Sequence, residues 1–263
     1  MNKSQPQFLE RAIYFREELS GDYFILWIWD EALGEKCQPG QFFEIRAHYS
    51  IADAEETRSL PKLFKPISIY DNAEGRIGFF IKKVGAGTNA LYKLKAGDLL
   101  ELIGPSGNGF PLVTGRKILL VSGGIGYPPL WYLQKKLIKH NLLYWVHGGS
   151  GQSDVFPFDE VCPEDGSFGK KGMVTEGMGK LIAEKKIDLV YSCGPVPMLK
   201  ECAIITTELN IEHYCSIEAY MACGIGVCYG CAIPVGQEND WNYLRVCKEG
   251  PVFNAREVLW NKF

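Results

Sequence analysis

Cys223-Gly-Ile-Gly-Val-Cys228-Tyr-Gly-Cys231, followed after fifteen intervening residues by Cys247, is the stretch that decides the fold of the C-terminal part of this chain. The spacing C-x4-C-x2-C with a distant fourth cysteine is the plant-type pattern that holds a [2Fe–2S] cluster on four thiolates. We expect Gly224, Gly226 and Gly230 to adopt positive φ angles, so that the backbone wraps closely around an inorganic core. The predicted metal ligands are Cys223, Cys228, Cys231 and Cys247.

Tetrahedral zinc is the alternative occupant of these four cysteines, since four thiolates also bind Zn²⁺. Zinc sites usually contain two C-x2-C pairs, and here only Cys228 and Cys231 form one. The spacing therefore favours the iron–sulfur cluster over zinc.

Length and composition describe an ordinary globular chain. Its 263 residues are enough for two domains with their own cores and a small third. A net charge of −3 and a pI near 5.9 argue against a nucleic-acid partner, which would require a basic face. The sequence has no apolar run of membrane-spanning length and begins without a signal-peptide core. We therefore expect a cytoplasmic protein that does not enter a membrane.

Residues 1–112 have the pattern of short β-strands separated by turns. The expected strands are rich in β-branched and aromatic residues and are bounded by Gly, Pro, Asn and Asp. They are Tyr23–Trp29, Gln41–Ala47, Lys65–Tyr70, Arg76–Val84 and Asp98–Ile103. Several short strands at near-regular spacing predict an antiparallel β-barrel.

Two motifs in this first segment indicate a bound diphosphate. Lys65-Pro66-Ile67-Ser68 places a cation, a rigid proline and a hydroxyl close together. Val84-Gly-Ala-Gly-Thr88 precedes a short expected helix over residues 89–94. A glycine-rich turn that opens a helix is an anion site, because free N–H groups and the helix dipole converge there. Each motif is weak alone, but together they predict a barrel that binds a diphosphate attached to an aromatic ring.

Residues 113–213 change to alternating strands and helices. Strands are expected at Lys117–Ser122, Leu142–His147 and Asp188–Ser192, with helices extending to about residue 140 and about residue 209. Glycine-rich turns follow the first and third strands, and this order is the dinucleotide-binding arrangement, in which ligand lies at the carboxyl ends of the strands. The residues expected to contact the dinucleotide are Gly123, Gly124, Gly126, Cys193 and Gly194.

The sequence indicates the identity of the dinucleotide and the role of Cys193 less strongly than it indicates the fold. The first turn is not G-x-G-x-x-G, and no Lys or Arg occurs between Asn141 and Phe168, where a 2′-phosphate would require one. NAD is therefore favoured over NADP. Cys193 is either a small buried residue that ends a strand or a soft side chain that lines the nicotinamide site. No base is paired with it, so we do not expect a nucleophile.

The order of these motifs, together with Gly104-Pro-Ser-Gly-Asn-Gly-Phe110 and Cys193-Gly-Pro-Val-Pro-Met198, resembles the ferredoxin–NADP reductase superfamily. The chain is most similar to the electron-transfer subunits of class 1B dihydroorotate dehydrogenase. That resemblance covers essentially the whole chain, and its most specific parts are Met221–Cys231 and Val246–Phe253.

The resemblance implies an FAD-binding β-barrel over residues 1–112, an NAD-binding α/β domain over 113–213 and a [2Fe–2S] domain over 214–263. It also implies a separate FMN-containing catalytic subunit, arranged with this chain as a 2+2 heterotetramer, that oxidises dihydroorotate to orotate in pyrimidine biosynthesis. The residues that match the family's FAD contacts are Lys65, Pro66, Ile67, Ser68, Ile81, Lys82, Lys83, Gly87 and Thr88. Lys65 replaces an arginine, which keeps the charge but loses the bidentate fork for phosphate.

The implied route for electrons runs from the FMN of the partner through the cluster and FAD of this chain to NAD⁺. Tyr220, Met221, Val227 and Tyr229 surround the cysteines and are candidates for the partner surface, because apolar and aromatic residues suit an interface core. A second interpretation is an NAD(P)H–ferredoxin or sulfide-linked reductase subunit with the same order of modules. A third, from another class, is a non-catalytic redox-sensing or metal-binding module.

Overall fold

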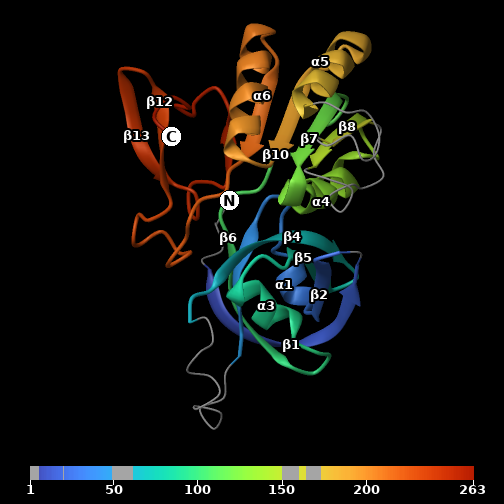
Figure 1. Ribbon diagram of the computed structural model, residues 1–263, viewed down its shortest axis with the longest axis vertical. Helices are drawn as coiled ribbons and strands as arrows, with labels where there is room; N and C mark the ends of the chain where they lie inside the picture. Colours follow the sequence, from blue (N-terminus) through green and yellow to red (C-terminus); the bar gives the residue numbers. More distant parts are fainter. Residues whose placement is uncertain (1–5, 20, 49–61, 150–159, 164–172) are drawn as a thin grey trace.

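The computed structural model describes residues 6–19, 21–48, 62–149, 160–163 and 173–263. Figure 1 shows a β-barrel, a helix-covered sheet beyond one end of it, and a C-terminal hairpin beside that sheet. The expected fold class, an antiparallel barrel followed by a Rossmann-like α/β domain and a small C-terminal cysteine segment, is confirmed.

The barrel is closed, with the strand order β1-β2-β5-β4-β3-β6 and antiparallel pairing throughout. Phe24, Leu26 and Ile28 are fully buried because alternate residues of a strand point to the barrel interior. The strands are β1 (Gln7–Glu18), β2 (Tyr23–Trp29), β3 (Phe42–Ala47), β4 (Lys65–Ala73), β5 (Arg76–Lys82) and β6 (Leu99–Ser106).

Two short helices interrupt the barrel. Helix α1 (Glu31–Gly34) begins at Asp30, whose carboxylate accepts a hydrogen bond from the Leu33 amide at 2.9 Å. Helix α3 (Ala86–Tyr92), with Gly85 as its N-cap, begins three residues before the range expected from the sequence. The helix starts earlier because Thr88 Oγ1 accepts hydrogen bonds from the amides of Val84 and Gly85 and so closes the turn.

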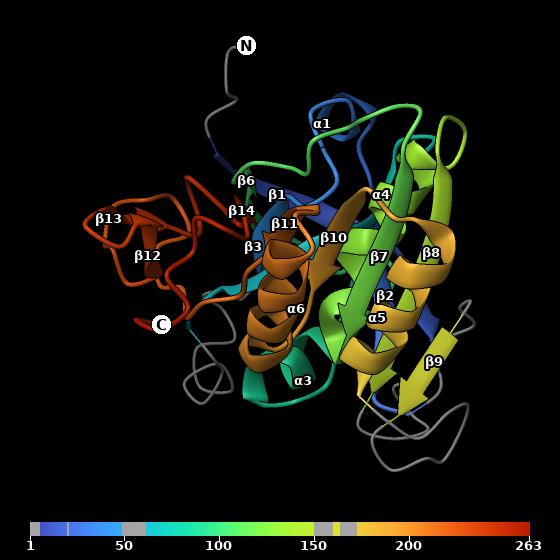
Figure 2. The same cartoon turned by 90° about the horizontal axis from the view of Figure 1, so that it is seen from above.

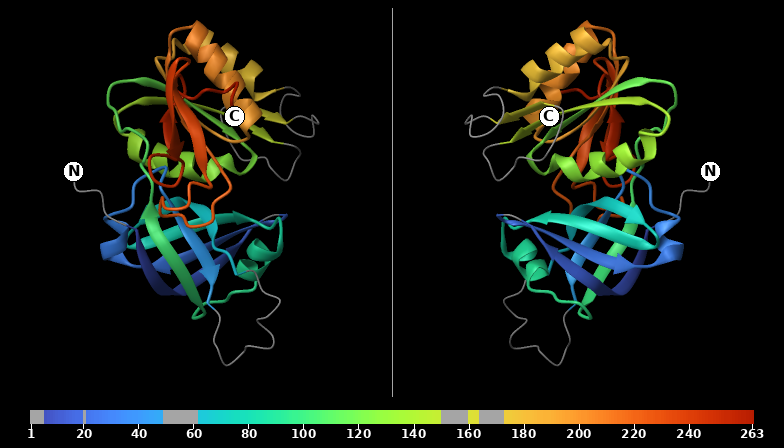
Figure 3. Two further views of the ribbon diagram at one scale, coloured as in Figure 1. Left: turned by 90° about the vertical axis from the view of Figure 1, so that its left-hand side faces the viewer. Right: turned by 90° about the vertical axis from the view of Figure 1, so that its right-hand side faces the viewer.

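The α/β domain has a sheet with the strand order β14-β11-β10-β7-β8-β9, parallel except for β14. Its strands are β7 (Lys117–Gly123), β8 (Leu142–Gly149), β9 (Glu160–Pro163), β10 (Leu189–Cys193), β11 (Glu212–Ser216) and β14 (Val252–Asn254). Helix α4 (Tyr127–Leu137), preceded by the 3₁₀ turn Gly124–Gly126, covers the face toward the barrel. Helices α5 (Val174–Lys185) and α6 (Val196–Glu208) cover the other face, as Figure 3 shows.

The C-terminal segment is joined to this sheet. Strand β11 spans the expected boundary between residues 213 and 214, and β14 pairs with it antiparallel, so the chain leaves the sheet and returns to it. Between these strands lie the cysteine-rich loop and the hairpin of β12 (Ala232–Gln237) and β13 (Asp240–Arg245). In Figure 2 the hairpin lies beyond the β14 edge of the sheet.

Helix α4 fixes the α/β domain on the barrel. Lys135 Nζ lies 2.7 Å from both carboxylate oxygens of Asp71 on β4. The Tyr132 hydroxyl donates to the Cys37 carbonyl at 3.1 Å and accepts from Asn72 Nδ2 at 3.1 Å. These bonds link the two domains through one helix. Among the described residues, no helix has the length and apolar character needed to cross a membrane.

Candidate functional site

The register of the C-terminal hairpin brings two of the four cysteines together. Cys231 immediately precedes β12, Cys247 follows β13 by two residues, and Ala232 pairs with Arg245 in the ladder. The Cys247 amide lies 3.5 Å from Cys231 Sγ, and both side chains are buried. Burial, followed by the neighbouring Cys231 thiol, raises the pKa of Cys247 to about 12. Cys231 and Cys247 therefore form an inner pair.

Cys223 and Cys228 form an outer pair on the loop that precedes the hairpin. Cys223 is partly buried and Cys228 is exposed. Burial raises the pKa of Cys223, but hydrogen bonds from the amides of Cys228, Ile225 and Val227 outweigh it and lower this pKa to about 6. The loop therefore stabilises a thiolate at position 223, which is the form that binds metal.

The loop backbone wraps as expected at two of the three glycines. Gly224 and Gly226 have φ angles of +63° and +81°. The expectation for Gly230 is wrong, because Tyr229 adopts the left-handed conformation instead, with φ +60°. Gly230 directs its amide to Cys228 Sγ at 3.4 Å, so it still supplies an N–H group to a ligand sulfur.

The arrangement of the four sulfur atoms fits a two-iron cluster better than a single zinc ion. Zinc bound to four thiolates at about 2.3 Å would bring all the sulfur atoms within about 4 Å of one another. Among the described residues, the group of three or more ligand atoms that lie within 4.8 Å of one another contains no cysteine. Two separate thiol pairs instead match two iron atoms with two cysteines each.

A cavity of about 280 Å³ lies between the barrel, the α/β domain and the start of the cysteine loop. Most of the expected flavin-contacting residues line it: Lys65, Pro66, Ile67, Ser68, Ile81, Lys82 and Thr88. Lys83 and Gly87 do not. Lys83 pairs with Asp22 and lies over the Tyr92 ring, whereas Gly87 lies beneath the Lys65 side chain.

The cavity has the chemistry that a flavin with a diphosphate requires. Lys65 and Lys82 line it and supply positive charge, and Phe80, Ile125 and Pro128 supply apolar walls for an aromatic ring. A Cβ at Gly87 would lie 2.5 Å from Lys65 Cε, so this glycine allows the lysine stem to cross the helix start. The residues present therefore fit FAD.

The two glycine-rich turns of the α/β domain meet beside this cavity. Cys193 lines the cavity, and a Cβ at Gly126 would lie 2.1 Å from the Cys193 carbonyl oxygen. Gly123 and Gly194 pack against Met198, whereas Gly124 has open space around it. Burial raises the pKa of the Cys193 thiol, which keeps it neutral. The structure thus brings all five predicted dinucleotide-site residues together, with three of them in tight packing roles.

Glu44 is a feature of this region that the sequence did not reveal. It lies on β3 with 1% of its surface exposed, and neither carboxylate oxygen has a hydrogen-bond partner within the described residues. A Cβ at Gly224 would lie 2.3 Å from Glu44 Cγ, so the carboxyl contacts the cysteine loop. Burial and then the Cys223 thiolate raise its pKa to about 7, while Lys65 opposes that rise. Glu44 therefore lies between the cavity and the cysteines.

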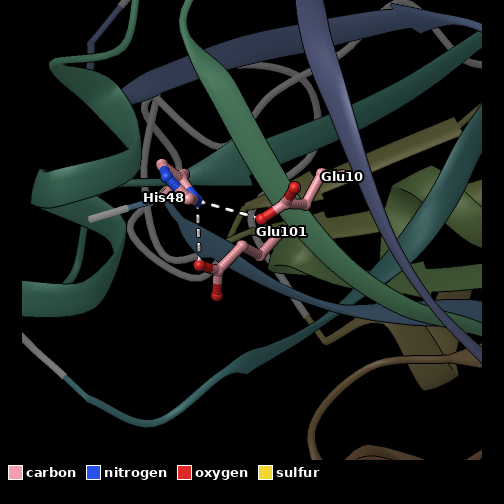
Figure 4. A group of neighbouring side chains, drawn as sticks. All are labelled: Glu10, His48 and Glu101. Atoms are coloured by element: carbon pink, nitrogen blue, oxygen red, sulfur yellow. Dashed lines mark hydrogen bonds and ion pairs between the residues drawn. The ribbon is translucent and has the colours of Figure 1, made fainter. Parts of the chain in front are cut away.

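Figure 4 shows a second group of titratable side chains, Glu10, His48 and Glu101. His48 follows the last residue of β3, and none of the three lines the cavity. His48 Nδ1 is 3.1 Å from Glu101 Oε1 and 3.2 Å from Glu10 Oε1. Arg46 donates to the remaining Glu101 oxygen, with Nε at 2.8 Å. Because the hydrogen bonds already account for each of these side chains, we interpret the group as an ion-pair network that joins β1, β3 and β6.

Comparison with known proteins agrees with this site. The iron–sulfur cluster binding domain of dihydroorotate dehydrogenase B matches residues 218–259. The electron transfer subunit of dihydroorotate dehydrogenase B (NAD(+)) from Caldanaerobacter subterraneus subsp. tengcongensis is 40% identical over 86% of this chain and 89% of its own. The corresponding subunit from Shouchella clausii is 34% identical over 98% of this chain and all of its own. The chain belongs to this family of electron-transfer subunits.

Solved structures place the family member in a wider fold group. The structure of an NADH-dependent reduced ferredoxin–NADP oxidoreductase has a TM-score of 0.81 and 29% identity over 95% of this chain and 90% of its own. A ferredoxin NADP⁺ reductase from Neisseria gonorrhoeae, 15% identical over 78% of this chain and 91% of its own, has a TM-score of 0.53 and shares the fold. Family and fold together confirm the expected oxidoreductase class and its cofactors, FAD, a [2Fe–2S] cluster and NAD. The assignment of individual cofactor contacts stays a prediction.

Proposed function

We propose that this chain passes electrons from an FMN-containing catalytic subunit, through its cluster and FAD, to NAD⁺ while the partner oxidises dihydroorotate to orotate in pyrimidine biosynthesis. The observation that supports this route is the direct connection between the cavity and the cysteine loop. Met221 lines the cavity and precedes Cys223 by two residues. The two proposed redox sites are therefore neighbours along the chain and in space.

When bound, a flavin exchanges a two-electron hydride with NAD and single electrons with an iron–sulfur cluster. The residues of this chain hold and orient the bound groups. Lys65 and Lys82 offer charge to the diphosphate, and Thr88 holds the turn at the start of α3 in place. Cys193 presents a neutral thiol to the cavity wall and acts as packing surface for the nicotinamide side. We assign no acid or base of this chain to dihydroorotate, whose chemistry belongs to the partner.

The surface around the cysteine loop suits the proposed catalytic partner. Tyr220 is 99% exposed, Val227 72% and Tyr229 55%. Met221, in contrast, faces the cavity and contributes to the flavin site. Exposed apolar and aromatic side chains on a loop beside a redox centre fit a surface that a partner covers. A 2+2 heterotetramer, with one catalytic subunit on each cysteine loop, is the assembly we propose.

Co-expression with a candidate FMN subunit tests this proposal. We expect a stable complex that reduces NAD⁺ with dihydroorotate, whereas either subunit alone does not. Val227→Asp should abolish co-purification while the chain keeps its iron and FAD. Ile138→Asp, at an exposed apolar position after α4 that lies outside the cysteine loop, is the control and should bind normally. An active complex of the Val227→Asp variant would show that the partner binds elsewhere.

A second function is supported by the structural similarity to the reduced ferredoxin–NADP oxidoreductase. In that function the chain would exchange electrons with ferredoxin or a sulfide-linked partner rather than with a dihydroorotate-oxidising subunit. The same complex distinguishes the two proposals. Ferredoxin-dependent NAD(P)⁺ reduction without dihydroorotate activity would favour the second.

A further inference from the structure

We propose that Arg245 is a positioning residue for the iron–sulfur cluster, which holds the outer cysteine pair against the inner pair and raises the reduction potential of the cluster by its charge. The inference rests on the proposed electron-transfer function. It concerns a residue that is not a metal ligand and that none of the sequence motifs singles out.

The loop that carries the outer pair depends on contacts from other segments. Residues 218–231 contain no helix or strand, so no ladder of backbone hydrogen bonds holds Cys223 and Cys228 in place. Gly226, midway between them, has a φ of +81°, and a Cβ there would lie 2.6 Å from Lys248 Cδ. The loop therefore packs on the turn that contains Cys247.

One guanidinium connects three segments that carry ligands. Arg245 Nη1 donates to the Gly226 carbonyl at 2.6 Å, inside the loop of the outer pair. Its Cζ lies 4.6 Å from the centre of the Tyr229 ring. Tyr229 lies between Cys228 and Cys231 in the sequence. Arg245 itself ends β13, two residues before Cys247. A planar fork with five donors can make these contacts together, whereas an ammonium group cannot.

Glu249 and Asn108 fix the direction of this guanidinium. Glu249 accepts from Arg245 Nε at 3.0 Å and from Nη2 at 2.5 Å. The backbone of the same turn is tied to the barrel by Asn108, whose Nδ2 donates to the Glu249 carbonyl at 2.6 Å and whose amide donates to the Gly250 carbonyl at 2.6 Å. Asn108 lies in the motif Gly104–Phe110. This motif therefore connects the barrel to the turn that contains Cys247.

The charge of Arg245 acts on the thiolates as well as on the loop shape. Arg245 lies two residues before Cys247, and its Nη1 reaches the Gly226 carbonyl between Cys223 and Cys228. A positive charge held beside the segments that carry the ligands also stabilises the extra electron of a reduced cluster. Hydrogen bonds and net charge are among the factors that set the potential of such clusters.

The test uses the chain loaded with its cofactors under anaerobic conditions, with iron analysis and a redox titration followed by EPR. Arg245→Gln should lose part of its iron, and the cluster that remains should have a lower midpoint potential, by up to about tenfold in the reduction equilibrium, or 59 mV for one electron. Arg245→Lys should restore the potential more fully than the iron content. Glu249→Gln should shift the potential upward, because it removes the opposing negative charge.

The opposite signs separate an electrostatic role from a merely structural one, since loop damage alone would not raise the potential in one variant and lower it in the other. Arg256→Gln is the control, because Arg256 bonds Asn210 and the Ile211 carbonyl, away from the cysteines. Wild-type iron content and potential in Arg245→Gln would overturn the inference. A wild-type chain that holds zinc would instead overturn the proposed function.

Discussion

Replacement of Gly126 by alanine tests how the two turns of the α/β domain form one wall of the cavity. The new Cβ would lie 2.1 Å from the carbonyl oxygen of Cys193 and 2.7 Å from the amide nitrogen of Gly194. Favourable contacts begin at about 3.5 Å, so helix α4 and the Cys193–Gly194 turn must separate by about 1 Å. The opposing atoms belong to the backbone and cannot rotate away.

The cost follows from the same geometry. Overpacking a core lowers the free energy of unfolding by about 1–3 kcal/mol. Because the neighbour of the new Cβ is rigid backbone, we expect Gly126→Ala to lower it by about 3 kcal/mol, which corresponds to a loss of about 6–12 °C in Tm for a chain of this size. Because Cys193 lines the cavity, reduction of the flavin by NADH should slow at least tenfold while iron content stays normal. Thermal unfolding followed by circular dichroism and stopped-flow flavin absorbance measure the two effects.

Gly179→Ala is the matched control for Gly126→Ala. Gly179 lies inside helix α5, and a Cβ added there would meet no atom within 4 Å, so alanine should stabilise the protein by about 0.5–1 kcal/mol. A Gly126→Ala protein that melts with the wild type and is reduced by NADH at the wild-type rate would refute the close approach of the two turns.

Three further predictions follow from the cavity and its surroundings. Lys65→Arg should retain or increase FAD per chain, because it adds the planar fork, and a variant that purifies with less flavin would contradict the placement of Lys65. Gly87→Ala should lower FAD content by displacing Lys65, whereas Gly85→Ala, with no atom within 4 Å of the added Cβ, should not. Glu44→Gln should change the dependence of stability on pH. Burial raises the Glu44 pKa from 4.5 to about 7, so the folded state keeps a proton that the unfolded state has lost, and wild-type stability falls as pH rises through this window. Glu44→Gln lacks that fall, so at pH 8 its free energy of unfolding should exceed that of the wild type by up to about 3 kcal/mol, measured by urea unfolding. If stability depended on pH in the same way in both proteins, Glu44 would not be a buried, unpaired carboxyl.

The elements that sequence patterns predicted are those with strong burial contrast. The expected strand Tyr23–Trp29 coincides with β2, and β7, β8 and β10 lie within one or two residues of their expected ranges. Strand β1 was missed because most of its residues are exposed or half-buried and only Ile13 is buried. Strand β13 was missed for the same reason, since four of its six residues are exposed.

Some features of the candidate site could likewise be predicted from the sequence, and others depend on the fold. The four cysteines could be named from their spacing, but their pairing could not, because it depends on the register of β12 with β13. Glu44 and Gly224 are 180 residues apart, and only the closed barrel brings β3 beneath the cysteine loop. In the sequence Arg245 is an ordinary charged residue, and only the fold brings its guanidinium to the Gly226 carbonyl.

The most direct test of the central claim is an anaerobic titration of the purified chain with NADH, followed by visible absorbance, EPR and metal analysis. We predict two irons per chain, loss of flavin absorbance, and an EPR signal from a cluster that has accepted one electron. A chain that contains zinc in place of iron, or a bound flavin that NADH leaves oxidised, would contradict the account.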